Sequence, residues 1–313
     1  MNIRLLAAAL LLAANVFAAD QKLRIAVIPI GTSHVFWKSV EAGAKAAGQE
    51  LGVDIAWKGP LNENERAQQI AIVEQFTTEG VSGIVLSPMD DTALVRPVAA
   101  AMAKKIPVVI FNSALKGEVG KDFISYVATD NRLGGRLGGE HLAKLLGEKA
   151  NVVLLRYQVG TAGTMEREEG FLAAIHQHPG LVMTVDNRYG GATMASAKTA
   201  SLNLIDKLRE AQGVFCPNES STFGMLLALR QSNLAGKIRF VGFDTSPPLI
   251  EALQKGEIDA LVAQDPVKMG YLGVKTCVAH IRGEPVEPNI DTGVRLITRE
   301  NLNDPAVKKL LGL

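Results

Sequence analysis

The amino-acid sequence predicts an α/β protein built from two doubly wound parallel-sheet lobes with a ligand cleft between them. Strand-length apolar runs alternate with helix-length amphipathic segments along almost the whole chain. This alternation is typical of parallel sheets covered by helices on both faces. The strand-like runs form two sets of five: 23–29, 53–57, 83–87, 108–111 and 124–128, then 151–156, 182–186, 213–216, 239–242 and 260–263.

Length and composition agree with two lobes. The chain has 313 residues, which corresponds to two domains at about 150 residues each. Hydrophobic residues make up 47% and charged residues 21% of the chain, as in ordinary globular proteins, so each lobe can bury its own core. We expect short crossings near 129–131, 264–266 and 291–294. The N-terminal lobe would then hold 20–130 and 265–291, and the C-terminal lobe 131–264 and 292–313.

Two helices between the strands have readable ends. One carries an apolar face of Val40, Ala44, Ala47 and Leu51 and should end at Gly52, since glycine is the usual residue just past a helix. A second has Phe223, Leu226, Leu227 and Arg230 at helical spacing after the capping residues Ser220 and Ser221. The glycine-rich run 134–139 departs from the dinucleotide-binding pattern, so it favours close helix packing.

Residues 1–18 read as a secretory signal peptide. Arg4 precedes an apolar run over 5–14, and small residues precede a cleavage point after Ala18. No cysteine follows the run, so lipid attachment is not indicated, and we expect the mature protein in the periplasm. Removing Arg4 leaves 32 basic and 32 acidic residues, a balance that gives no attraction to nucleic acid or an anionic membrane. No later run is long enough to span a bilayer.

Cysteine and histidine usage excludes other classes. The chain has two cysteines, Cys216 and Cys277, too few for a disulfide scaffold or a four-cysteine zinc module. We expect no bridge between them because they fall in different lobes. No metal-binding histidine motif, phosphate loop or nucleophile elbow is present, so neither an enzyme nor a resident cofactor or metal is predicted.

Polar and aromatic residues gather after the strands, where open parallel sheets bind ligands. The candidate cleft residues are His34, Phe36, Trp37, Ser87, Asn112, Ser113, Thr129, Gln158, Arg167, Tyr189, Asn218, Phe243, Asp244 and Gln264. Amides, carboxylates and guanidinium groups pair with hydroxyls, which both donate and accept hydrogen bonds. Aromatic rings pack against the C–H faces of a sugar. This composition predicts a neutral polyhydroxylated ligand.

At these residues the chain resembles the ribose-type periplasmic binding proteins of sugar ABC transporters, in the type I periplasmic binding protein family. The resemblance spans about Leu23 to Arg295 and rests on the order and spacing of seven motifs: Ile25-Ala26-Val27, Phe36-Trp37-Lys38-Ser39, Ile106-Pro107-Val108-Val109, Thr129-Asp130-Asn131, Glu166-Arg167-Glu168-Glu169-Gly170-Phe171, Val241-Gly242-Phe243-Asp244 and Ala263-Gln264-Asp265-Pro266. It implies Rossmann-like lobes joined by a three-crossing hinge, with a sugar trapped between them and delivered to a membrane permease and its ATPase.

The resemblance also implies residue roles. It places Phe36 and Trp37 on one face of the sugar and Tyr189 and Phe243 on the other, with His34 where the family often has asparagine. Ser87 and Thr129 would supply hydroxyls, and the polar contacts of the second lobe would come from Arg167, Asn218, Asp244 and Gln264.

One departure from the family pattern concerns ligand choice. Ribose binders carry Asp-Arg where this chain has Asn112-Ser113. Each charged hydrogen bond lost there is worth about 1.5–3 kcal/mol. The departure therefore argues against ribose itself.

Plainer roles stay open for several of these residues. Phe36 and Trp37 fit packing at a helix start, Asp244 fits a cap for a helix near Pro247, and Arg167 fits a surface ion pair. His34 fits an ordinary loop, Asn218 fits turn and capping chemistry, and Gln264 fits hinge backbone.

Two functions of different classes use the same cleft. One is the solute-binding component of an importer, expected to act as a monomer. The other is a ligand-sensing receptor subunit for a chemoreceptor or a sensor kinase.

Overall fold

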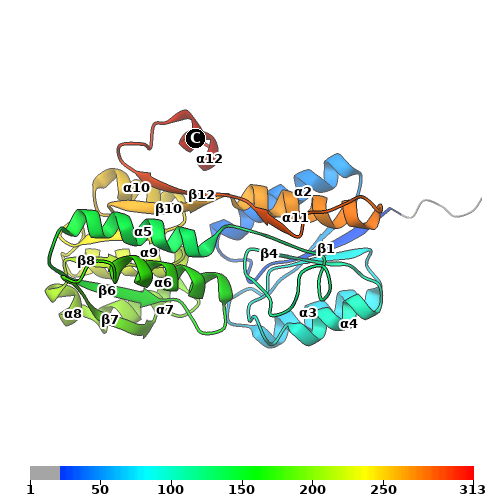
Figure 1. Cartoon of the computed structure of the whole chain (residues 1–313), viewed down its shortest axis with the longest axis horizontal. Coiled ribbons are helices and arrows are strands. Elements are labelled where there is room, and N and C mark those ends of the chain that lie inside the picture. Colours follow the sequence, from blue (N-terminus) through cyan, green and yellow to red (C-terminus); the bar gives the residue numbers. More distant parts are fainter. Residues whose placement is uncertain (1–21) are drawn as a thin grey trace, which may run out of the picture.

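The computed structural model describes residues 22–313, and the expected signal peptide, 1–18, lies outside them. Two six-stranded sheets form two lobes that lie end to end along the long axis of the molecule (Figure 1). This arrangement confirms the predicted fold class.

The first sheet has the strand order β11-β5-β4-β3-β1-β2 and all its pairings are parallel. Its strands are β1 (Arg24–Ile28), β2 (Asp54–Trp57), β3 (Gly83–Leu86), β4 (Val108–Phe111), β5 (Ser125–Ala128) and β11 (Asn289–Asp291). Helices α2 (Val35–Leu51) and α11 (Pro266–Ile281) pack on one face and α3 (Arg66–Glu79) and α4 (Val95–Ala103) on the other, each over its own apolar core.

The second sheet has the order β12-β10-β9-β8-β6-β7. Its strands are β6 (Ala150–Arg156), β7 (Leu181–Tyr189), β8 (Gly213–Phe215), β9 (Arg239–Phe243), β10 (Ala260–Gln264) and β12 (Val294–Thr298). One face is covered by α5 (Asn131–Leu146) and α6 (Ala162–Ile175). The other carries α7 (Met194–Leu202), α8 (Ile205–Glu210), α9 (Glu219–Gln231) and α10 (Pro247–Lys255), while α12 (Pro305–Leu311) ends the chain.

All ten predicted strands are present, and the structure adds two. β11 has only three residues, and β12 pairs antiparallel with β10. Neither strand therefore has the apolar run, typical of a buried parallel strand, by which the other ten were predicted. Residues 291–294 form the third crossing between the sheets. The chain also crosses between β5 and α5 and between β10 and α11 (Figure 1).

Glycines let paired helices approach closely in each lobe. A Cβ on Gly135 of α5 would lie 1.9 Å from the carbonyl oxygen of Arg167 on α6. A Cβ on Gly43 of α2 would lie 1.9 Å from the carbonyl oxygen of Val267 on α11. The glycine-rich run 134–139 therefore has the packing role that the sequence indicated, and it fixes the backbone that carries Arg167.

Two local expectations are confirmed. Gly52 ends α2 in the left-handed conformation, with φ of 70°. Cys216 and Cys277 are both free and buried, in the cores of different lobes. No helix in residues 22–313 combines the length and the apolarity that a membrane crossing requires.

Candidate functional site

A cavity of about 40 Å³ lies between the lobes and opens to solvent. The first lobe lines it with Ile30, His34, Phe36, Trp37, Glu63, Asn112 and Ser113, and the second with Tyr157, Thr161, Gly163, Thr164, Arg167, Asn218, Glu219, Asp244 and Gln264. Most of these residues follow the carboxyl ends of strands, as expected for a parallel sheet.

Nine of the fourteen predicted residues meet at this cavity: His34, Phe36, Trp37, Asn112, Ser113, Arg167, Asn218, Asp244 and Gln264. The lobes therefore bring together residues that are up to 230 positions apart in the chain. Five others, Ser87, Thr129, Gln158, Tyr189 and Phe243, lie elsewhere.

Arg167 is the buried cation of the second lobe, with 4% of its surface exposed. Its Nε donates to Asn131 Oδ1 at 2.8 Å, its Nη1 to the carbonyl of Pro217 at 3.0 Å and its Nη2 to Gln264 Oε1 at 2.8 Å. These bonds hold the guanidinium plane in one orientation. Arg167 does not form the surface ion pair considered for it. Glu168 instead pairs with Arg156, whose Nη1 lies 2.7 Å from Glu168 Oε2.

Asp244 follows β9 with φ of 71° and points into the cavity instead of toward α10. Its Oδ1 accepts from Gln264 Nε2 at 2.7 Å and its Oδ2 from the backbone N–H of Glu219 at 2.8 Å. The N-cap of α10 is Ser246. Burial raises the pKa of the Asp244 carboxyl, although Arg167 acts in the opposite direction.

Asn218 lines the cavity and also begins α9. Its Oδ1 accepts from the Ser221 N–H at 3.3 Å, and the Ser221 hydroxyl accepts from the Asn218 N–H at 3.3 Å. This reciprocal capping box makes Asn218 the N-cap residue, which confirms the capping role considered for it. Ser221 takes part as the third residue of the helix, and the expectation that Ser220 and Ser221 precede the helix as caps was wrong. The side-chain Nδ2 of Asn218 donates to the Ser220 hydroxyl at 3.0 Å.

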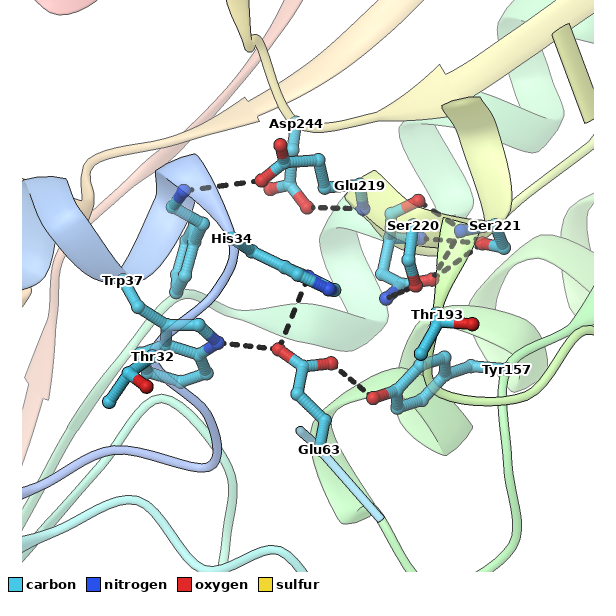
Figure 2. Close-up of polar contacts among 12 residues, drawn as sticks. Thr32, His34, Trp37, Glu63, Tyr157, Thr193, Glu219, Ser220, Ser221 and Asp244 are labelled. Carbon is cyan, nitrogen blue, oxygen red and sulfur yellow. Dashed lines mark hydrogen bonds and ion pairs between the residues drawn. The ribbon is translucent and has the colours of Figure 1, made fainter. Parts of the chain in front are cut away.

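Aromatic and acidic groups of the first lobe meet around Glu63. Trp37 is buried, stands edge-on to Phe36 with ring centroids 4.9 Å apart, and donates its indole N–H to Glu63 Oε1 at 2.5 Å. His34 Nδ1 lies 3.4 Å from the same oxygen. Figure 2 shows the His34 ring reaching toward Glu63 from the side of Asp244 and Glu219.

Asn112 and Ser113 line the first-lobe wall. Asn112 has φ of 61°, a left-handed conformation that asparagine tolerates well, and donates its Nδ2 to the Ser87 hydroxyl at 3.0 Å. Ser113 accepts from the N–H of Gly163 across the cleft at 3.2 Å. The hydroxyl of Ser87 thus supports Asn112 from beneath and does not line the cavity.

The other four predicted residues have different surroundings. Thr129 lies in a crossing, 3.4 Å from the Thr292 hydroxyl, and Gln158 donates to the carbonyl of Glu63 at 2.8 Å. Tyr189 ends β7 with 46% of its surface exposed. Phe243 is fully buried beneath Arg167. The second-lobe aromatic side chain that lines the cavity is Tyr157.

Sequence reading missed three residues with ionisable side chains. Tyr157 directly follows β6, so the rule that selects strand ends could have found it. Glu219 is the first residue of α9, a position where an acidic side chain is common for helix stability alone. Glu63 lies in the segment between β2 and α3, within a polar run that resembles a solvated loop, so no pattern marked it.

The charges of the cavity are uneven. Glu63, Glu219 and Asp244 face a single arginine, Arg167, with His34 among them. Burial, and then the carboxylate of Asp244, raises the pKa of Glu219. No cluster of three or more His, Cys, Asp or Glu side chains in residues 22–313 is arranged to hold a metal ion.

Comparisons with known proteins agree with this architecture. The family model of the periplasmic binding protein domain matches residues 25–285. The ribose import binding protein RbsB of Escherichia coli is 31% identical over 290 residues, covering 92% of this chain and 93% of the relative. The D-ribose/D-allose-binding protein of Pseudomonas aeruginosa is 27% identical, covering 94% of this chain and 97% of the relative.

Solved structures give the same result. A carbohydrate transporter solute-binding protein from Agrobacterium radiobacter, in complex with D-arabinose, superposes with a TM-score of 0.89 at 33% identity, over 93% of this chain and 99% of that one. An ABC transporter solute-binding protein from Agrobacterium vitis with bound D-fucose superposes with a TM-score of 0.88 at 32% identity, over 92% of this chain and 99% of that one. The fold and the interlobe cavity define a two-lobed binding protein. The chain belongs to the periplasmic binding protein family of the ribose type, whose members are substrate-binding proteins of transport systems and are not enzymes.

Proposed function

We propose that this protein is the solute-binding component of an ABC importer. It captures a neutral sugar or polyol in the interlobe cavity by hinge closure and delivers it to a membrane permease that is driven by an ATPase. The observation that carries the proposal is the convergence of Arg167, Asn218, Asp244 and Gln264 with Phe36 and Trp37 on one cavity.

The chemistry of the cavity supports a hydroxyl-rich ligand. Amide and carboxylate groups offer both donors and acceptors, and a sugar hydroxyl uses both. Phe36 and Trp37 offer apolar ring surface against which the C–H faces of a sugar ring pack. The relatives named for ribose and allose, and the solved structures holding D-arabinose and D-fucose, support the same class of ligand.

Closure of the lobes is the proposed capture step. Groups from both lobes line the cavity, so a ligand that contacts both favours the closed state over the open one. The three crossings between the sheets are the elements about which the lobes would turn. Action as a monomer in the periplasm, after export by the signal peptide, belongs to the same proposal.

The test is a melting-temperature screen of the purified mature protein against pentoses, hexoses and polyols. A ligand at 100 times its Kd stabilises the folded state by about 2.7 kcal/mol, which raises the Tm measurably. Calorimetry then gives the affinity of each hit. If no member of the panel raises the Tm at millimolar concentration, the sugar-binding proposal is rejected.

A further inference from the structure

Glu219 of the second lobe binds the start of a helix in the first. Helix α2 has His34 as its N-cap, without a side-chain capping bond, and no acidic residue in its first turn. The backbone N–H of Phe36, in that turn, donates to Glu219 Oε2 at 3.2 Å across the cleft. A carboxylate is the preferred partner of a helix N-terminus, so the second lobe completes a helix of the first.

Glu63 makes the reciprocal contact from the first lobe. Its Oε1 accepts the Trp37 indole N–H within its own lobe, and its Oε2 accepts the hydroxyl of Tyr157 from the second lobe (Figure 2). Gln158 adds a bond from its Nε2 to the backbone carbonyl of Glu63 at 2.8 Å. Because Glu63 and Tyr157 are 6% and 1% exposed, opening the cleft would break a water-excluded contact.

The two carboxylates differ from Asp244 in the lobe from which their hydrogen-bond donors come. Both oxygens of Glu63 and one of Glu219 take hydrogen bonds that join lobes or fix the Trp37 ring. Asp244 accepts only from groups of its own lobe, so opening the cleft would leave its hydrogen bonds intact.

We propose that Glu63 with Tyr157, and Glu219 with the first turn of α2, are two reciprocal latches that set the equilibrium between the open and closed lobes. They are positioning residues, and they fix how tightly any ligand is held without choosing which ligand is held. This inference rests on the proposed function, because it assumes that the cleft closes on a sugar.

A latch and a ligand contact have different signatures. The apparent affinity of a ligand depends on the fraction of protein that can reach the closed state, and that fraction is common to all ligands. Loss of a latch therefore weakens the binding of every sugar by the same factor. Loss of a ligand contact changes the factor from one sugar to the next.

The experiment measures the Kd of three or more sugars that wild-type protein binds, using calorimetry. Tyr157→Phe removes only the hydroxyl that crosses the cleft, and Glu219→Ala removes the acceptor for Phe36. Each substitution should raise the Kd of all the sugars by one common factor, about five- to thirtyfold. Glu219→Gln keeps an acceptor oxygen and should recover most of the affinity.

Tyr271→Phe is the matched control. The Tyr271 hydroxyl donates to Glu50 Oε2 at 2.6 Å, a tyrosine–carboxylate bond between α11 and α2 within one lobe, so its loss should leave every Kd unchanged. Unchanged affinities in Tyr157→Phe or in Glu219→Ala overturn the reciprocal pair. A reordered preference among the sugars also overturns it, because these residues would then contact the ligand. Failure of the wild-type protein to bind any sugar would instead reject the proposed function.

Discussion

Arg167 lies over the ring of Phe243, with its guanidinium carbon 4.3 Å from the ring centroid. Phe243 is in turn edge-on to Phe215, with centroids 6.3 Å apart. The guanidinium thus sits on an aromatic platform and is held at its edges by hydrogen bonds to Asn131 and Gln264. A cation fixed in this way pays little further entropy when it binds a ligand.

Replacing Arg167 or Asp244 by alanine should abolish tight sugar binding while the protein stays folded. The charged hydrogen bonds that each side chain would give a ligand are worth about 1.5–3 kcal/mol apiece, and neighbouring buried groups lose a partner as well. Calorimetry with the best sugar from the thermal screen measures the loss, and the Tm of the free protein checks the fold. Wild-type affinity in both variants would refute the site.

Asn112→Asp combined with Ser113→Arg should change which sugar is preferred. Both positions line the cavity, and the double substitution restores the carboxylate and guanidinium typical of ribose binders. A fixed bidentate pair discriminates among hydroxyl arrangements more sharply than an amide and a hydroxyl do. The readout is the ranking of Kd values across the sugar panel, and an identical ranking would reject this role.

The fold could be predicted from the sequence because its strands are short, apolar and evenly spaced. The two strands that the sequence did not predict, β11 and β12, lie where the chain passes between the lobes. Asn289 and Asp291 in β11 are polar and exposed, so this segment contains no apolar run that would predict a strand. Pairing with an edge strand was set by the tertiary arrangement instead of by local composition.

The site could be predicted where a residue directly follows a strand or a family motif. Tyr189 shows where the strand-end rule fails, because β7 is an edge strand and runs on to Tyr189 itself, which leaves the ring exposed. The prediction for Phe243 was wrong for another reason, because successive side chains along a strand point to opposite faces of the sheet. Its neighbour Asp244 faces the cavity, and Phe243 packs into the core beneath Arg167.

Gly135→Ala should destabilise the second lobe and weaken sugar binding together. The new methyl group would stand 1.9 Å from the Arg167 carbonyl oxygen, so α5 and α6 must separate, and overpacking of this kind costs about 1–3 kcal/mol. Separation moves the backbone that carries the guanidinium. Thermal unfolding should show a Tm several degrees lower, with a weaker Kd, whereas Lys144→Ala on the exposed side of α5 should leave both unchanged. A Gly135→Ala protein with wild-type Tm would contradict the close helix contact.

The stability of Asp244→Asn relative to that of the wild-type protein, both without ligand, should be greatest at neutral pH and should fall as the pH falls. Burial raises the pKa of the Asp244 carboxyl in the folded state, so the folded protein holds this proton more tightly than the unfolded chain does. Such a group favours folding below its unfolded pKa of about 3.9, and this contribution is lost as the pH rises through the higher folded value.

Asparagine carries no charge and tolerates the φ of 71° at this position, so the substitution removes the cost of the buried anion. It also replaces one acceptor oxygen by an amide nitrogen that cannot accept from Gln264 Nε2 or from the Glu219 N–H, a loss that does not depend on pH.

The measurement is the Tm of both proteins without ligand between pH 4 and pH 8. The titrations of groups remote from residue 244 cancel in the difference, and the pKa of Glu219, which the Asp244 carboxylate raises, changes in the direction that adds to the same trend. The Tm of Asp244→Asn minus that of the wild-type protein should be largest at pH 7–8 and should diminish toward pH 4. A difference that grows on acidification would mean that Arg167 outweighs burial and keeps the Asp244 carboxylate ionised in the empty cavity.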